Sequence, residues 1–200
     1  MESLKATATT ALAFSFLLPL AAASPARAGE LHQAHTIIVS AERLTTAQYV
    51  VSSALNNDSI NVSTEIYVFP GPIQARTPFN VPRLAVDCLA ANHFTLGASL
   101  IVAHTEGSYD TLILANPRIG AMFPLSPAAE FWVRAGITYY QESGVGTKSG
   151  YGADIEAAFV FKVGDHLGVT LSALGDLGLH DSNGVDYANL GASGGLVGWF

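Results

Sequence analysis

The strongest constraint on the fold is a two-residue alternation of apolar and polar side chains that repeats along the second half of the chain. In residues 129–141, apolar side chains take every second position, and the positions between them carry residues such as Glu130, Arg134 and Thr138. Residues 151–161 and 167–179 repeat the pattern. A period of two puts successive side chains on opposite faces of an extended strand, so each stretch is predicted to be a β-strand.

These alternating stretches are long for strands of a soluble protein. They run for about a dozen residues, whereas an ordinary strand has about five or six and a tilted strand that crosses a bilayer needs about ten. No stretch after the first 28 residues reaches the roughly 18 consecutive apolar residues of a membrane helix. The pattern therefore favours strands that cross a membrane.

The connections between the strands are predicted to alternate in length. Short periplasmic turns and longer outer loops are typical of outer-membrane barrels. Short connections are expected near 90–93, 124–128 and 164–165, and longer ones near 105–110, 142–149 and 181–185, with the longest at 45–78.

We therefore expect an all-β fold, an eight-stranded antiparallel up-and-down transmembrane β-barrel in the cell outer membrane. An even number of strands closes on itself and leaves no unpaired edge in lipid. Segments 48–55 and 60–69, inside the long first connection, would raise the count to ten if they formed an extra hairpin. The strands are expected at 35–44, 79–88, 94–104, 111–123, 129–141, 150–162, 166–179 and 186–200.

The N-terminus has the pattern of a secretory signal peptide. Lys5 precedes an apolar stretch, and Ala26-Arg27-Ala28 forms an A-x-A site that predicts cleavage before Gly29. Residues 1–28 are thus a predicted signal peptide, and residues 29–200 a single barrel domain. Cleavage would change the net charge from −7 to −8, because it removes Lys5, Arg27 and Glu2. An acidic mature chain argues against nucleic acid as a partner.

The cysteine and histidine pattern supports neither a disulfide nor a metal site. Cys88 is the only cysteine, so it has no partner within the chain, and no Cys/His spacing matches a zinc motif. We expect no metal and no cofactor.

A set of charged residues falls on or close to the polar face of the predicted strands, which in a narrow barrel points inward. An acid/base or metal site is one interpretation. We favour an interior network of paired charges without an open pore, because buried carboxylates need partners and arginines are available. The set comprises Glu42, Arg83, Asp87, Arg118, Arg134, Asp154, Glu156 and Asp176.

The run HDSNGVDY at 180–187 resembles the His-x-Ser-Asn motif of the outer-membrane lipid A deacylases. That resemblance implies His180 as the base and Ser182 as the nucleophile. The position of the acidic third member is occupied here by Ser193 and Gly194. Because SNG is also ordinary turn chemistry, we favour a turn over an esterase.

Aromatic residues concentrate toward the ends of the predicted strands, which suits the aromatic girdles at the two membrane interfaces. They are Trp132, Tyr139, Tyr140, Tyr151, Tyr187, Trp199 and Phe200.

A wider resemblance covers nearly all of the mature chain. The phrases IIVSAERL (37–44), PRLAVDCLAANHFTLGASL (82–100), ILANPRIGAMFPLS (113–126), RAGITYY (134–140), DLGL (176–179) and GGLVGWF (194–200) resemble those of a family of small, functionally unassigned outer-membrane β-barrel proteins of Gram-negative bacteria. It implies fold and location but no activity.

The last strand ends in an aromatic residue, which resembles the signal that the outer-membrane assembly machinery recognises. Leu190, Ala192, Leu196 and Phe200 would share the lipid face, and the strand would pair with the first one. Outer-membrane lipid and the assembly machinery are therefore the expected partners, and a structural or surface-interaction role the expected function. The rival to a membrane barrel is a secreted, lipocalin-like binding barrel, which would enclose its apolar residues.

Overall fold

The computed structural model describes residues 31, 34–54, 57–69, 81–91, 93–105, 110–143, 147–182 and 185–200. The predicted signal peptide, residues 1–28, lies outside this part of the chain. None of the described residues belongs to a helix that is long and apolar enough to cross a membrane.

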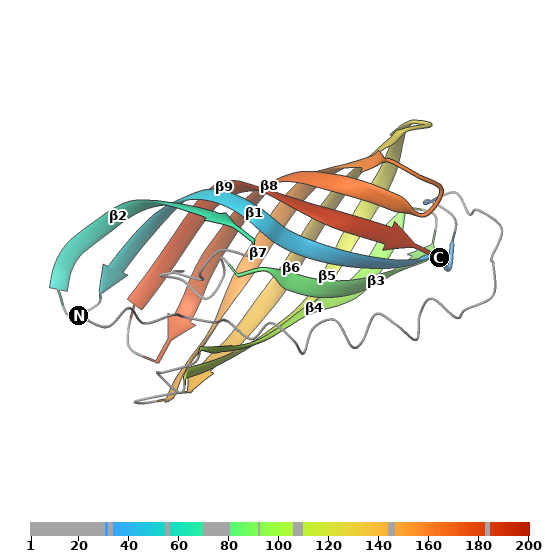
Figure 1. The fold of residues 1–200 in the computed structure, drawn as a ribbon. Helices are drawn as coiled ribbons and strands as arrows, with labels where there is room; N and C mark the ends of the chain where they lie inside the picture. The colour runs from blue at the N-terminus through green and yellow to red at the C-terminus, as the bar shows by residue number, and fades with distance from the viewer. Residues whose placement is uncertain are drawn as a thin grey trace, which may run out of the picture.

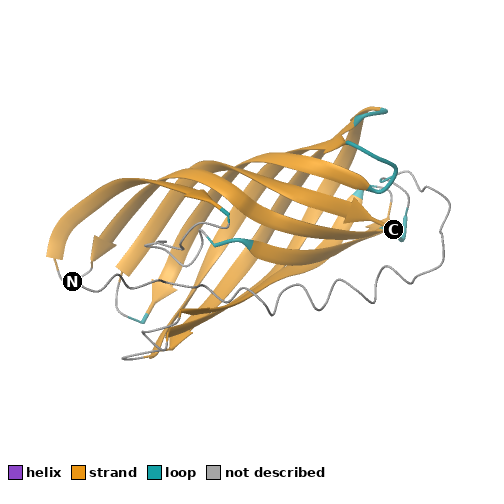
Figure 2. Ribbon diagram, viewed as in Figure 1, coloured by secondary structure: helices purple, strands orange, loops and turns teal. Residues whose placement is uncertain are grey.

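Long antiparallel strands make up almost the whole of the described chain (Figure 2). They are β1 (Ile37–Ala54), β2 (Asn57–Val68), β3 (Arg83–Ala91), β4 (Phe94–Thr105), β5 (Asp110–Ser126), β6 (Ala129–Ser143), β7 (Thr147–Lys162), β8 (Leu167–Asp181) and β9 (Val185–Trp199).

Eight of these strands close into a ring. From β3 to β9 each strand pairs with the next, and β1 closes the ring by pairing with β3 on one side and β9 on the other (Figure 1). The closing pairs include Ile38 opposite Trp199 and Ala41 opposite Leu196. The expected eight-stranded up-and-down barrel is confirmed, as is the pairing of its last strand with its first.

The ninth strand, β2, lies outside the ring. Thr45 to Ala54 extend β1 well beyond the expected end at Leu44, and β2 folds back along this extension with Thr45 opposite Val68. β3 pairs with β1 only as far as Glu42, so β2 occupies the flank of β1 that β3 leaves open. The predicted long loop is thus largely strand, and the described residues of segments 48–55 and 60–69 do form a hairpin. Its first arm is a continuation of β1, so among the described residues it adds β2 alone and the strands number nine rather than ten.

The observed difference in length between the connections at the two ends of the barrel is smaller than predicted. We call the end of the ring that carries Ile37 and Trp199 periplasmic and the opposite end outer. At the outer end only residues 106–109, 144–146 and 182–184 separate β4 from β5, β6 from β7 and β8 from β9. The polar stretches predicted as loops are taken up by the strands, which continue beyond the apolar part of the wall.

The two faces of the wall have opposite character. The predicted apolar stripe of β8 lies outside, with Leu171 56% exposed, whereas Asp176 of the same strand is buried. A soluble barrel buries its aliphatic side chains, so the lipocalin-like alternative is wrong. A closed wall with an apolar exterior is the arrangement that hydrocarbon surroundings require, because each strand of the ring pairs with a neighbour on both sides.

The interior is filled in layers. An apolar cluster near the periplasmic end includes Trp132, Trp199, Met122 and Leu89, and a second cluster toward the outer end includes Ile101, Leu114 and Tyr140. Trp132, Trp199 and Tyr140 are therefore interior residues rather than members of the predicted girdle, whereas Tyr139, Tyr151 and Phe200 are exposed on the wall. Buried charged residues lie between the two clusters.

A bulge in β1 shapes this charged layer. Between Ala41 and Thr45 the pairing with β9 advances by four residues on β1 but only two on β9, and Arg43 has a positive φ of 55°. Glu42 and Arg43 are both buried as a result, although they are neighbours in a strand. The bulge therefore places two side chains of opposite charge in the interior, at the same height along the barrel axis.

Candidate functional site

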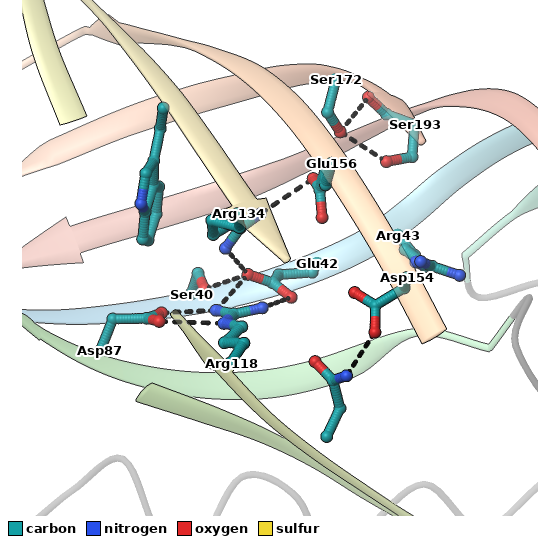
Figure 3. A network of polar contacts seen from close by, with 12 residues as sticks. Ser40, Glu42, Arg43, Asp87, Arg118, Arg134, Asp154, Glu156, Ser172 and Ser193 are labelled. Carbon is teal, nitrogen blue, oxygen red and sulfur yellow. Dashed lines mark hydrogen bonds and ion pairs between the residues drawn. The ribbon is translucent and has the colours of Figure 1, made fainter. Parts of the chain in front are cut away.

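The centre of the buried charged layer is the carboxylate of Glu42. Arg118 donates to it through both terminal nitrogens, Nη1 to Oε2 at 2.7 Å and Nη2 to Oε1 at 2.8 Å. Arg134 Nη1 also donates to Oε1, and the Ser40 hydroxyl donates to it at 2.8 Å (Figure 3). Strands β1, β5 and β6 are thereby joined across the lumen through one carboxylate.

Two further carboxylates extend this group to both sides. Arg118 Nε donates to Asp87 Oδ1 at 2.9 Å, and Arg118 Nη2 bonds the other oxygen of Asp87. Arg134 Nη2 lies 2.8 Å from Glu156 Oε1. Acidic and basic side chains therefore alternate from β3 to β7, which compensates the cost of burying each charge.

A second set of polar contacts surrounds Asp154 and Asp176. Arg43 donates two hydrogen bonds to the Asp176 carboxylate, of 2.8 and 3.0 Å. Asp154 accepts hydrogen bonds from Asn116 Nδ2 at 2.5 Å and from the Thr138 hydroxyl at 3.1 Å. These pairs add links from β1 to β8 and from β5 and β6 to β7.

The indole of Trp132 lies directly beside the ion pairs. The guanidinium of Arg134 lies 4.1 Å from the centre of its ring, and that of Arg118 lies 5.9 Å away. The indole Nε1 donates to the Thr95 hydroxyl at 3.1 Å. The aromatic face thus stabilises the arginines on the side where they meet the periplasmic apolar cluster.

The structure buries all eight residues of the predicted charge set. Arg83, the first residue of β3, lies directly opposite Glu42 in the pairing of β1 with β3. The pattern missed Arg43, because strict alternation assigns it to the face opposite that of Glu42. It also missed Asn116 and Thr138, although both lie on the same face of their strands as Arg118 and Arg134, and that parity was a readable signal.

Small residues make room for these long side chains. Gly97 lies directly opposite Asp87 in β4, and a Cβ atom at this position would lie 2.5 Å from the carbonyl oxygen of Val86. A Cβ at Gly136 would lie 2.6 Å from Asn116 Nδ2. Bare backbone at both positions is what lets the polar side chains cross the lumen.

Chemically, this layer is a set of mutually neutralised charges. Its carboxylates already receive hydrogen bonds from arginine, amide or hydroxyl donors. Among the described residues, no group of three or more His, Cys, Asp or Glu side chains is placed to hold a metal ion. The layer is therefore suited to linking the strands of the wall and filling the lumen, rather than to supplying a free carboxylate as a catalytic base.

The residues of the deacylase-like motif do not face one another. The ring of His180 lies against that of Tyr151 on the outside of the wall, with centroids 5.5 Å apart. The hydroxyl of Ser182 accepts a hydrogen bond of 3.1 Å from the Ser149 backbone, and the Ser182 N–H donates to the Ser149 carbonyl at 2.9 Å. These two bonds continue the pairing of β8 with β7 by one residue beyond Asp181, which lies opposite Gly150.

Known proteins share this architecture. The crystal structure of Neisserial surface protein A (NspA) superimposes with a TM-score of 0.50 and 10% sequence identity, and covers 82% of this chain and 97% of that chain. The chain folds as a small outer-membrane β-barrel. The solid-state NMR structure of outer membrane protein AlkL in DMPC lipid bilayers gives a TM-score of 0.50 at 9% identity, with coverage of 89% and 95%. No protein-family model and no curated protein sequence matches the chain.

Within this outer-membrane barrel, Phe200 completes the junction of the ring. Its N–H donates to the Ile37 carbonyl at 2.9 Å, and its carbonyl accepts from the Ile37 N–H at 3.0 Å. Its side chain lies on the outer wall with the ring parallel to that of His166, at a centroid separation of 6.2 Å. The backbone of Phe200 therefore closes the ring, and its side chain is left on the lipid face.

Replacing Phe200 by alanine is expected to reduce assembly in cells more than it reduces stability. The backbone bonds to Ile37 do not depend on the ring, so the refolded barrel keeps them, whereas an aromatic recognition signal is lost. Phe161→Ala is the matched control, because Phe161 is equally exposed on the same face near the periplasmic end. The measurements are the amount of heat-modifiable barrel in membranes and the urea midpoint after refolding into vesicles. Equal losses of inserted protein in the two variants would contradict a special role for Phe200.

Proposed function

We propose that this protein is a non-conducting outer-membrane barrel that presents its β1–β2 hairpin for contacts at the cell surface. The observation that carries the proposal is the free edge of β2. Within the described part of the chain, β2 pairs with β1 along one side and with no strand along the other. An unpaired edge is a template for an added strand from a partner protein.

The side chains of β2 support a contact role. Ile60, Val62, Ile66 and Val68 alternate along its outer face, and Ile60 and Ile66 are 69% and 77% exposed. The hairpin reaches farther from the C-terminus than the ends of the other strands (Figure 1). An apolar, strand-shaped surface at that end of the barrel suits a protein partner that supplies both a strand edge and apolar side chains.

Site-specific photocrosslinking in intact cells tests this proposal. A benzoylphenylalanine at Val62 is expected to give discrete protein adducts. Val62→Lys or Ile66→Lys is expected to weaken the binding of any such partner protein. The control position is Ile137, which is exposed on the wall of β6 and is expected to meet lipid. Lipid adducts alone at both positions would overturn the contact role.

The absence of conduction follows from the ionic layer. Glu42 joins Arg118 and Arg134 across the lumen, and the Trp132 ring lies against the arginines on their periplasmic side. We expect the purified barrel to show no stable conductance steps in planar bilayers. Trp132→Ala, which thins the apolar layer but leaves Glu42 and its arginines in place, is expected to stay closed as well. Regular single-channel steps from the wild-type protein would contradict a closed barrel.

Insertion is proposed to proceed through the outer-membrane assembly machinery, with Phe200 as part of the recognised strand. Outer-membrane lipid is the proposed surrounding of the apolar wall. The Phe200→Ala comparison tests the first of these partners independently of the crosslinking experiment.

A further inference from the structure

Three aromatic rings form a row on the outer wall toward the outer end of the barrel. Tyr139 of β6 lies directly opposite Tyr151 of β7, which lies directly opposite His180 of β8. Tyr139 and Tyr151 are each 47% exposed, and His180 is exposed as well. The Tyr151 and His180 rings are stacked at 5.5 Å with an interplanar angle of 27°. The row therefore presents ring surface across three neighbouring strands.

The position of His180 depends on an irregularity in β8. The pairing shifts between Tyr151 and Gly152, so that Tyr151 faces His180 while Gly152 faces Gly178. Leu179 and His180 are consequently both exposed, although regular alternation would turn His180 to the same side as the buried Asp176. The bulge is what brings the imidazole to the outer wall beside Tyr151.

The wall changes character in order along these strands. Toward the periplasm, the next outward row consists of Ile137, Ala153 and Leu177, which are paired across the same three strands. On the other side of the aromatic row lie polar groups: the Tyr139 hydroxyl is 3.5 Å from Gln141 Oε1, and Ser149 and Ser182 bond to each other. An apolar surface, an aromatic surface and a polar surface therefore follow one another toward the outer end.

We propose that this row binds the sugar headgroup of a glycolipid in the outer leaflet. The apolar C–H face of a pyranose packs on aromatic rings, and its hydroxyl groups would meet the amide and hydroxyl groups of Gln141, Ser149 and Ser182. The acyl chains of the same molecule would lie along Ile137 and Leu177. A sugar anchored in the membrane fits because the row stands on the lipid-facing wall, directly above apolar surface.

The chemistry of the row favours a sugar over a phosphate. Tyr139, Tyr151, His180 and the three polar residues beyond them include no lysine or arginine, the residues that bind phosphate most strongly. The neighbouring Lys148 is exposed and lies directly opposite the acidic Glu142. The site lies on β6, β7 and β8 and does not involve the β1–β2 hairpin. The test of the glycolipid site is therefore independent of the test of the proposed surface contact.

Native mass spectrometry of the purified barrel tests the site with four lipids. Glucosyl diacylglycerol is compared with diacylglycerol of the same chains, with phosphatidylethanolamine and with lipid A, which carries a disaccharide and phosphates. We expect the glucosyl lipid to bind about fivefold more than diacylglycerol, which is the effect of one or two ring contacts. Lipid A is expected to bind at least as well, and phosphatidylethanolamine no better than diacylglycerol.

The variant Tyr151→Leu/His180→Leu should reduce binding of the glucosyl lipid to the level of diacylglycerol. Tyr49→Leu is the control, since Tyr49 is an exposed tyrosine on the outer wall of β1. If the double variant does not fold, as judged by its heat-dependent mobility, Tyr139→Leu serves in its place. Equal binding of the glucosyl lipid and diacylglycerol, or an equal loss in Tyr49→Leu, would overturn the proposal. Preference for phosphatidylethanolamine would also overturn it, because the headgroup contact would then be with phosphate or ammonium.

Discussion

Replacing Glu42 by glutamine is expected to lower the free energy of unfolding by about 3 kcal/mol or more. The change removes the charge that Arg118 and Arg134 share, and both guanidinium groups remain buried. Each keeps one other partner, Asp87 or Glu156, so the ring should still close. The measurement is urea unfolding in lipid vesicles followed by tryptophan fluorescence, to which the buried Trp132 and Trp199 respond.

Glu142→Gln is the matched control for that experiment. Glu142 is only partly buried near the outer end of β6, opposite Lys148, where solvent screens the charge. Its substitution is expected to change the free energy of unfolding by no more than about 0.5 kcal/mol. Equal effects of the two substitutions would show that the interior ion pairs do not stabilise the barrel.

Gly97→Ala is expected to have a comparable or larger effect, although it adds a single methyl group. The new Cβ would lie 2.5 Å from the Val86 carbonyl oxygen and would also collide with the Asp87 carboxylate. Because Val86 contributes backbone, relief requires β3 to move away from β4, which also pulls Asp87 away from Arg118. We expect a loss of about 3 kcal/mol, or failure to form the heat-modifiable species on a detergent gel.

Gly175→Ala separates this clash from a general cost of removing glycine from a strand. The atom nearest to a Cβ at Gly175 is Ile155 Cγ2 at 3.6 Å, an ordinary contact distance. This variant is expected to fold with a stability within about 0.5 kcal/mol of the wild type, because the added methyl group meets no clash and alanine destabilises a strand less than glycine does. If both variants fold equally well, the space opposite Asp87 is not required for the ionic layer.

Several features were predictable because they depend only on side-chain alternation. The apolar positions of β6, β7 and β8 were correctly assigned to one face, and the charged residues Arg134, Glu156 and Asp176 to the other. The parity of the strands then led to a closed barrel with those charges inside. The sequence pattern also contained Asn116 and Thr138 at inward positions, so their part in the polar layer was readable by the same rule.

Two irregularities break the alternation rule, and they move a side chain of the charged layer and a side chain of the aromatic row. The bulge at Arg43 turns that guanidinium inward to Asp176, and the shift beside Tyr151 turns His180 outward. A bulge depends on how two strands fit each other, and no property of one strand alone specifies it. The deacylase-like interpretation of His180 and Ser182 assumed proximity in sequence, whereas their contacts are with Tyr151 and Ser149 on the neighbouring strand.

The sequence by itself determined the fold class, the even number of ring strands and the sign of each face, because a period of two assigns every side chain of a regular strand to one side of the wall. Only the tertiary structure decided that β2 joins β1 outside the ring, that Trp132 and Trp199 fill the lumen and that Glu42 is the shared partner of two arginines. The physical reason is that strand register and the closure of the ring fix which side chains meet across the lumen, and both are properties of pairs of strands far apart in the chain.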